Sequence, residues 1–149
     1  MDQATKAPVH LWIVGIASLL WNAFGGYNYT MTRTRGADYL RDMMPGSDAN
    51  AMMAYIDSFP MFAQIGWGLG VWGAVAGSIL LLLRSRWAVV AFAVSMIGAV
   101  LSLGYQLVGP PGPAGMSEGS QAVMPYVIIA LAVAQLLYAQ TMRTKGALR

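Results

Sequence analysis

The sequence predicts an all-α fold, an integral membrane four-helix bundle that forms a single domain over residues 1–149. Only 10% of the residues are charged and 57% are hydrophobic, whereas charged residues make up about a quarter of a soluble domain. Four apolar runs contain no Asp, Glu, Lys or Arg, and each is about as long as the roughly 20 residues that a helix needs to cross a bilayer. These predicted spans are residues 9–30, 61–83, 87–108 and 122–142.

The charged residues predict how the bundle is oriented, because loops richer in Lys and Arg face the cytoplasm. One side of the predicted bundle carries the larger set of basic residues, namely Lys6, Arg84, Arg86, Arg143, Lys145 and Arg149. The other side mixes the two signs, with Arg33, Arg35, Arg41, Asp38, Asp42, Asp48, Asp57 and Glu118. We therefore expect both termini and the hairpin at 84–86 in the cytoplasm, and an even number of spans agrees with this.

The first span, residues 9–30, follows Pro8, a residue that suits the first turn of a helix. His10 and Trp12 then fall at the inner membrane interface and Tyr27 falls at the outer one. A cleaved signal peptide is the alternative interpretation of this run. The run is too long for the apolar part of such a peptide and has no A-x-A cleavage site, so we expect a span.

The segment between the first two spans, residues 31–60, is too long to be a bare connection in so small a protein. Ser47 or Asp48 can cap a short helix that runs to Phe59 and places Met52 on its apolar side. We expect this outer loop to contain an amphipathic segment that lies on the outer surface, over the bundle or among the headgroups.

Small residues predict how the second and third spans pack. They recur every three or four residues, so they form one flat stripe on each helix, and membrane helices associate through such close contacts. The stripe of the second span is Gly66, Gly70, Gly73 and Gly77, and that of the third is Ala91, Ser95, Gly98 and Ser102. Because only residues 84–86 join the two spans, we expect antiparallel neighbours whose stripes face each other.

Four side-chain amides lie at or near membrane depth, and polar groups there face protein or a wet cavity. They are Asn22, Gln64, Gln106 and Gln135. The plainer interpretation is hydrogen bonding between helices. The sharper one is a small polar cavity in the outer half of the membrane that binds a hydroxylated ligand through hydrogen bonds and ring stacking. The candidate residues of this cavity are Trp21, Asn22, Tyr27, Asn28, Gln64 and Trp67.

Composition argues against several function classes. The net charge of +3 arises from basic residues at the span ends, where they anchor to anionic headgroups, so we expect no nucleic-acid partner. The absence of cysteine excludes disulfides and thiolate metal sites. The spans also lack Asp, Glu, Lys and Arg, the charged groups that would favour acid–base catalysis or proton pumping there. We therefore expect no enzyme, no catalytic residue and no cofactor.

Methionines gather in and beside the outer loop, and thioethers are soft ligands that suit Cu(I). They are Met31, Met43, Met44, Met52, Met53 and Met61. Adjacent methionines on a helix point about 100° apart, and no histidine joins them. Because methionine is also an adaptable filler of apolar interfaces, we expect packing here and assign no metal ligands.

Short sequence features along nearly the whole chain resemble a family of small bacterial four-span integral membrane proteins. They are His10-Leu11-Trp12, Leu20-Trp21-Asn22-Ala23, Tyr29-Thr30-Met31-Thr32 with Thr34-Arg35, Phe59-Pro60, Val71-Trp72-Gly73 with Gly77-Ser78, Leu81-Leu82-Leu83-Arg84, and the tail from Tyr138-Ala139 to Arg149. Most members are uncharacterised and some carry an automatic "sugar transporter" label. The resemblance implies a multi-pass protein of the bacterial inner membrane, without catalytic residues to transfer. Some relatives carry an acidic residue where this chain has Asn28.

Two functions of different classes remain open. The favoured hypothesis is an accessory or scaffold subunit whose glycine-lined faces pack against other membrane chains or a second copy of itself. The alternative is a small transporter or carrier that binds a polar solute such as a sugar. Four spans offer few surfaces for alternating access unless the protein dimerises, which favours the first hypothesis. The predicted partners are the lipid bilayer and either another membrane protein or a second copy.

Overall fold

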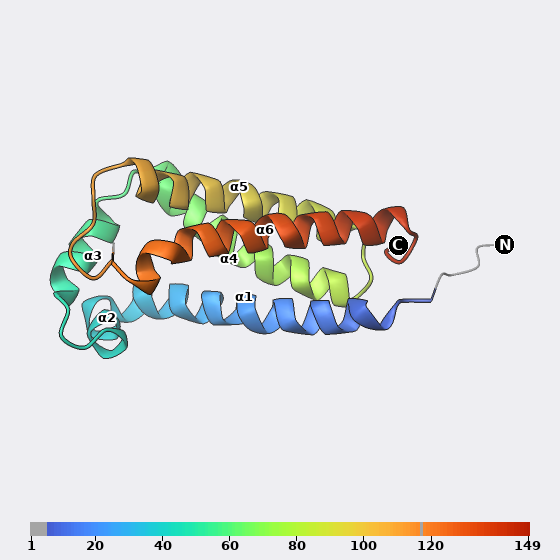
Figure 1. The fold of residues 1–149 in the computed structure, drawn as a ribbon, viewed down its shortest axis with the longest axis horizontal. Helices are drawn as coiled ribbons and strands as arrows, with labels where there is room; N and C mark the ends of the chain where they lie inside the picture. The colour runs from blue at the N-terminus through green and yellow to red at the C-terminus, as the bar shows by residue number, and fades with distance from the viewer. Residues whose placement is uncertain (1–5, 117) are drawn as a thin grey trace.

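The computed structural model describes residues 6–116 and 118–149, and these residues form six helices (Figure 1). Four of the helices are long and apolar enough to cross a membrane. These are α1 (Val9–Arg35), α4 (Met61–Leu82), α5 (Trp87–Val108) and α6 (Ser120–Thr144). Two short helices, α2 (Ala37–Met43) and α3 (Ala49–Asp57), lie between α1 and α4.

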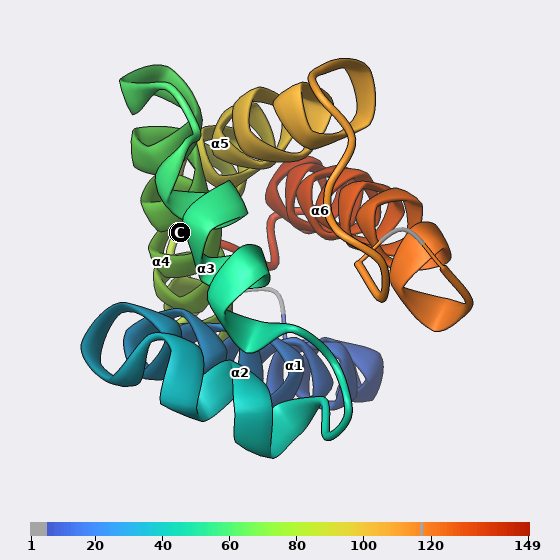
Figure 2. The same cartoon turned by 90° about the vertical axis from the view of Figure 1, so that its left-hand side faces the viewer.

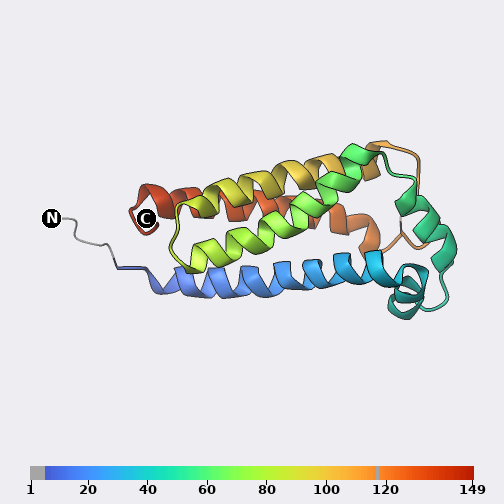
Figure 3. The same cartoon turned by 180° about the vertical axis from the view of Figure 1, so that it is seen from behind.

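The four long helices run side by side, and the two short ones lie across one end of the bundle (Figure 1 and Figure 3). Helix α4 packs against both α1 and α5, and α5 packs against α6. Seen from the end, a gap separates the ribbons of the neighbouring helices α1 and α6 (Figure 2). The pairs α1 and α4, α4 and α5, and α5 and α6 are in contact. The bundle is therefore held together through α4 and α5.

The outward faces of the long helices carry large apolar side chains. Val9 is 74% exposed, and residues such as Ile16, Leu20, Ile79 and Ile97 are also exposed. A soluble monomer rarely shows continuous apolar patches of more than a few hundred Å². Together with the length of the helices, this surface indicates a multi-pass membrane protein.

The third span has the predicted bounds, and the others differ from prediction at their ends. Helix α1 continues past residue 30 to Arg35 and stops at Gly36, whose φ of +58° is a left-handed conformation that glycine adopts without strain. The threonines of this last part donate their hydroxyl groups to backbone carbonyls one turn earlier, as Thr32 does to Asn28 at 2.7 Å. The helix therefore extends beyond the apolar run because nothing in the sequence interrupts it before Gly36.

The outer loop contains the short helix that the sequence predicts. Asp48 caps α3, because its Oδ1 accepts a hydrogen bond from the backbone N–H of Ala51 at 3.0 Å. The helix ends at Asp57 rather than Phe59. Helix α2 was not predicted; it is set off from α1 by Gly36, and Gly46, with φ of +87°, lies between it and α3.

Helices α2 and α3 form a hydrophobic cluster of their own over one end of the bundle, which we call the cap. Its members are Met31, Ala37, Tyr39, Leu40, Met44, Ala49, Met52, Met53, Ile56 and Met116. Met52 at its centre has no exposed surface. The loop between α5 and α6 contributes Met116 to the cluster, so the cap connects both halves of the chain.

The glycine stripe of α4 faces α5 within the same chain. A Cβ placed on Gly66 would lie 2.8 Å from the carbonyl oxygen of Gly98, and one on Gly73 would lie 3.0 Å from the backbone nitrogen of Ser95. At the far end the ring of Phe92, and not Ala91, provides the nearest atoms to Gly77, with a Cβ there 2.7 Å from the ring. The two backbones are thus in direct contact along most of the interface.

The last residues fold back onto the opposite end of the bundle from the cap. The backbone N–H of Arg149 donates to the carbonyl of Arg84 at 2.7 Å, and the N–H of Arg86 donates to the carbonyl of Arg149 at 2.8 Å. Leu148 is buried in a cluster that includes Leu11 and Leu81. This tail therefore joins α6 to the turn between α4 and α5.

Candidate functional site

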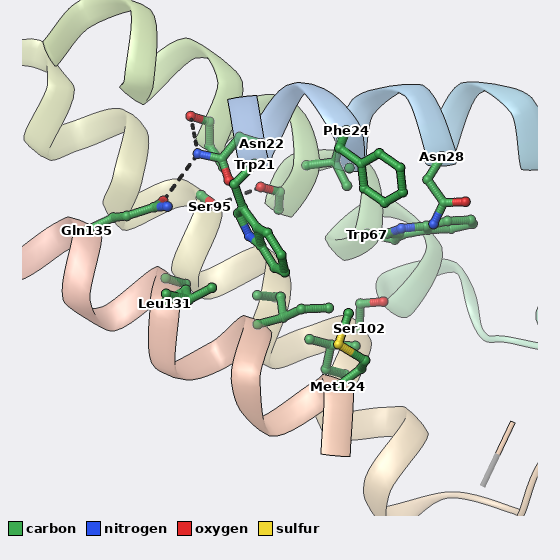
Figure 4. A pocket seen from close by; sticks show the side chains of 18 of the residues that line it. Trp21, Asn22, Phe24, Asn28, Trp67, Ser95, Ser102, Met124, Leu131 and Gln135 are labelled. Carbon is green, nitrogen blue, oxygen red and sulfur yellow. Dashed lines mark hydrogen bonds between the residues drawn. The ribbon is translucent and has the colours of Figure 1, made fainter. Parts of the chain in front are cut away.

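A cavity of about 210 Å³ lies among the four long helices (Figure 4). Helix α1 contributes Trp21, Asn22, Phe24, Gly25 and Asn28 to its walls, and α6 contributes Met124, Ile128, Leu131, Ala132 and Gln135. Helices α4 and α5 contribute Gly66, Trp67, Gly70, Val71, Ala74, Ser95, Ala99, Ser102 and Leu103. The small residues among these form the back of the cavity, where α4 and α5 are in contact.

Asn22 is the polar centre of this site and connects three helices. Its side-chain nitrogen donates to Ser78 Oγ at 2.8 Å and to the carbonyl of Ala74 at 3.2 Å, both on α4. The same nitrogen lies 3.3 Å from Oε1 of Gln135 on α6. Asn22 is only 8% exposed, so these bonds form out of contact with bulk solvent. Figure 4 shows the Asn22 amide joined by a dashed line to Gln135 of α6.

The partners of Asn22 determine which way its amide points. The carbonyl of Ala74 can only accept, and the Ser78 hydroxyl already donates to that carbonyl at 2.8 Å. The group of Asn22 that faces them must therefore be its NH₂. Gln135 must likewise turn its oxygen to Asn22.

Polar atoms remain without a partner in the cavity. Among the described residues no hydrogen bond reaches Oδ1 of Asn22, Nε2 of Gln135 or Oγ of Ser102. None of the three is fully buried, because no buried side-chain N or O atom of the described residues lacks a partner, so each keeps accessible surface in the wall of the cavity. The site thus offers an acceptor, a donor and a hydroxyl that can do both.

The remaining walls are apolar and aromatic. Trp21 and Phe24 line the cavity although they are 39% and 57% exposed, so they stand at its mouth. Leu131 and Met124 face them from α6 (Figure 4). No charged or titratable side chain is among the lining residues that the structure describes. The site can hold a neutral molecule through hydrogen bonds and ring contacts, and it offers no group for proton transfer.

Four of the six residues predicted for a polar cavity line this one, and two lie elsewhere. Trp21, Asn22, Asn28 and Trp67 are in its walls. Tyr27 and Gln64 are not among its lining residues. Tyr27 is 55% exposed and contacts the cap through an edge-on ring contact with Tyr39 at 6.3 Å.

Gln64 is bound to its own end of α4. Its Oε1 accepts from the guanidinium of Arg33 at 3.0 Å, and its Nε2 donates to the carbonyl of Phe59 at 2.9 Å. Arg33 in turn lies over the rings of Tyr29 and Trp67, 5.8 Å and 5.1 Å from their centroids. Gln64 therefore holds the corner where α1 meets α4, beside the cavity.

The other arginines of the outer loop pair with carboxylates at the surface. Arg35 lies 2.7 Å from Asp42, and Arg41 lies 2.9 Å from Asp38. Arg33 instead contacts the rings of Tyr29 and Trp67 and the amide of Gln64.

Asn28 connects the cavity to the cap. Its Oδ1 accepts a hydrogen bond from the hydroxyl of Tyr39 at 2.8 Å. Burial of Tyr39 raises the pKa of its hydroxyl above the ordinary value of 10.0; nearby Tyr27 adds to the rise and Arg35 opposes it. Tyr39 therefore stays neutral and keeps donating over the physiological pH range.

Sequence reasoning missed two polar residues of the site, one on α6 and one on α5. Gln135 was identified as an amide at membrane depth but was not placed in the cavity, and Ser102 was assigned to helix packing alone. Their signal in the sequence was polarity within an apolar run. Nothing in the spacing of the runs says that α6 faces α1 across a cavity.

The methionines of the outer loop mostly serve packing. Met31, Met44, Met52 and Met53 belong to the cap, whereas Met43 and Met61 are exposed. Within the described ranges no three residues of the types His, Cys, Asp and Glu gather into a metal site. His10, at the other end of α1, has its Nδ1 2.6 Å from the hydroxyl of Tyr138 on α6.

Comparisons of the chain with protein-family models, with curated proteins and with solved structures find no match. The function proposed below is therefore inferred from the geometry of the cavity.

Proposed function

We propose that this chain is a small carrier of a bacterial inner membrane and that it binds a neutral, hydrogen-bonding solute in the cavity around Asn22. The observation that supports this most directly is the set of unpartnered polar atoms on Asn22, Gln135 and Ser102 within a cavity of about 210 Å³. Among the described residues no fully buried side-chain N or O atom lacks a partner, so these three atoms keep accessible surface and are free to bond a guest in the cavity. A bound solute supplies the missing partners.

The neutrality of the solute follows from the lining. Transfer of a charged group from water into an apolar site is costly unless a counter-charge is present. Because the described lining residues carry no charge, an uncharged solute with one or two polar groups fits best. The rings of Trp21 and Trp67 give it flat apolar contacts.

We further propose that both ends of the chain face the cytoplasm. The ends of α1 and α6 that lie away from the cap are at the same end of the bundle as the turn between α4 and α5 (Figure 1). That end carries Arg84, Arg86, Arg143, Lys145 and Arg149. The excess of basic residues favours the cytoplasmic side.

The accessory-subunit hypothesis has less support from the structure. It relied on the glycine stripe as a contact surface for other chains, and the stripe from Gly66 to Gly77 is occupied by α5 of the same chain. The other outward faces of the long helices are apolar, and lipid covers such faces as readily as a protein partner does. The hypothesis stays a prediction, and the experiment below also tests it.

Native mass spectrometry of the gently extracted protein tests both functions. We expect the wild type to retain a small neutral molecule and Gln135→Leu to lose most of it, because one hydrogen bond of about 1 kcal/mol corresponds to roughly fivefold in affinity. Gln140→Leu is the matched control, since Gln140 is exposed on the same helix.

Three results would count against the carrier or its site. Wild-type protein that retains no small molecule in any mild detergent or native-membrane particle contradicts it. Equal retention by wild type, Gln135→Leu and Gln140→Leu moves binding away from the cavity. Co-purification of a stoichiometric second membrane chain, with no small molecule, favours the accessory subunit instead.

A further inference from the structure

We infer that the solute is a membrane-dissolved amphiphile with a hydroxyl head, and that it enters the cavity sideways, between α1 and α6, from the lipid. This inference rests on the proposed function and specifies its substrate class and route. Four features of the cavity support it: where it is closed, where it is open, which polar atoms line it, and how large it is.

The back of the cavity is closed by helix packing. Helices α4 and α5 are in backbone contact there, since a Cβ on Gly70 would lie 3.1 Å from the backbone nitrogen of Ala99. The seam between α1 and α4 is also filled, because a Cβ on Gly26 would meet the ring of Trp72 at 3.4 Å. A solute therefore has no route through these two interfaces.

The outer end is covered by the cap. Helices α2 and α3 lie across the end of the bundle (Figure 2), and Met52 at the centre of the cap has no exposed surface. The bond between Tyr39 and Asn28 ties the cap to the wall of the cavity. A water-soluble molecule that approached from this side would meet a packed apolar cluster.

The open side lies between α1 and α6. These helices do not pack against each other as the other neighbours do, and side-chain bonds such as those from Asn22 to Gln135 and from His10 to Tyr138 connect them. Trp21 and Phe24 are both exposed and part of the cavity lining, so this side is the mouth. Both residues lie in the middle and outer half of an apolar span, where the surrounding medium is hydrocarbon.

The unpartnered polar atoms select the head group. Oδ1 of Asn22 can accept a further hydrogen bond, and Nε2 of Gln135 can donate one. A single hydroxyl donates one hydrogen bond and accepts others, so it can satisfy both, and Ser102 can join from α5. An alkane leaves all three unsatisfied, and a carboxylate brings an unpaired charge.

The volume selects how much of the amphiphile is enclosed. An apolar cavity of about 150 Å³ holds one benzene molecule, so about 210 Å³ holds a head group and a short length of chain or one ring. A longer tail must extend through the mouth past Trp21 and Phe24 into the lipid. The amphiphile is thus bound by its head while its tail stays in the bilayer.

Photolabelling in vesicles tests this directly. The full chain is reconstituted in phosphatidylcholine vesicles with trace hexadecanol that carries a diazirine near the hydroxyl end, and the labelled peptides are mapped by mass spectrometry. We expect label on lining residues such as Leu131 and Ser102, and at least a fivefold loss of that label with excess unlabelled hexadecanol. Excess hexadecane is expected to leave it unchanged.

Two variants locate the site and control for folding. Gln135→Leu and Ser102→Ala are each expected to reduce the saturable label, and Gln140→Leu to preserve it. Ser102→Ala removes a single oxygen, so it keeps the test decisive if Gln135→Leu fails to fold. The chain has no cysteine, so Phe24→Cys with Ile128→Cys can be joined by a bis-maleimide, and closing the mouth in this way is expected to abolish the saturable label.

The possible failures are distinguishable. Label that spreads evenly over the exposed apolar faces and does not compete overturns the inference. Unchanged saturable label after the mouth is cross-linked overturns lateral access. Retention of a water-soluble polyol in native mass spectrometry, without saturable hexadecanol labelling, overturns the amphiphile but leaves the proposed carrier intact. Loss of both kinds of binding contradicts the carrier itself.

Discussion

Gly98 of α5 lies so close to α4 that a Cβ on it would be 2.5 Å from both the carbonyl oxygen of Gly66 and the backbone nitrogen of Gly70. Atoms of a real side chain do not approach backbone this closely, so the helices could not keep this separation with any other residue at Gly98. In a bilayer, where lipid competes for apolar surface, such close backbone packing is a main source of helix association. The wall behind the cavity depends on it.

The variant Gly98→Ala is expected to lower the free energy of unfolding by about 1–3 kcal/mol, because the added methyl group must push α4 and α5 apart. The measurement is denaturation by SDS in mixed micelles, followed by circular dichroism. Gly104→Ala is the matched control on the same helix, since nothing lies within 4 Å of a Cβ there. It should be neutral or slightly stabilising, and equal losses in the two variants would contradict the packing argument.

Asn22 gives a second test, in which two substitutions should differ. Asn22→Leu removes hydrogen bonds between membrane helices that are worth about 0.6 kcal/mol on average, so a small loss of stability is expected. Asn22→Asp places an acceptor and a charge against Ser78 and the carbonyl of Ala74 and should cost about 3–5 kcal/mol at neutral pH.

The same SDS titration measures both variants of Asn22, with Asn50→Leu and Asn50→Asp as controls on the exposed side of α3. If Asn22→Asp is as stable as Asn22→Leu, then the NH₂ group of Asn22 does not face the carbonyl of Ala74, and the amide orientation given above is wrong.

The spans could be predicted because hydropathy and charge are local properties of the chain. The run at 87–108 coincides with α5, whereas α1 extends beyond its run to Arg35. The difference has a physical reason: a helix does not end where the hydrocarbon ends, and polar residues such as Thr32 continue it until Gly36. The length of an apolar run therefore indicates the length of the membrane crossing and not the length of the helix.

The contact of α4 with α5 was predictable because only residues 84–86 join the two predicted spans. The residues that meet along this contact were predictable only in part. The stripe was expected to run through Ala91, whereas Phe92 meets Gly77. Equal spacing on two helices keeps residues on one face, but the angle at which the helices cross decides which residues stay in contact toward the ends.

The cavity was predictable only in part, because it depends on where the fourth span lies. Asn22 and Trp67 could be placed near each other from the first two spans alone. Gln135 could not, since no short connection ties α6 to α1. Gln64 was assigned to the cavity by depth, but Arg33 and the carbonyl of Phe59 bind it instead.

Tyr39 predicts a pH dependence of the cap. Burial raises the pKa of Tyr39 above its ordinary value of 10.0, so the folded cap binds the phenolic proton more tightly than the unfolded chain does. The stabilising contribution is therefore complete below pH 10 and is lost as the pH rises through the higher folded value.

Hydrogen exchange of α2 and α3 between pH 8 and 11, corrected for the intrinsic exchange rate, measures this effect. Protection should fall above pH 10 in the wild type. Tyr39→Phe should lose about 1 kcal/mol at neutral pH with the Asn28 bond and show a flatter profile. Tyr126→Phe, a change of an exposed tyrosine on α6, should keep the wild-type profile. A profile for Tyr39→Phe as steep as that of the wild type would assign the alkaline transition to another group.

The tail at Leu148 predicts a stabilising contact at the end of the bundle away from the cap. Leu148→Ala should lower the free energy of unfolding by about 2 kcal/mol, because Leu148 is buried with Leu11 and Leu81 in one cluster. Leu83→Ala, at a position 71% exposed beside the same turn, is the matched control and should have little effect on protein stability in micelles. The tail holds the turn between α4 and α5 through the backbone bonds of Arg149, so Leu148→Ala should also increase hydrogen exchange at Arg86. Unchanged exchange there, with reduced stability elsewhere, would show that the tail packs without holding the turn.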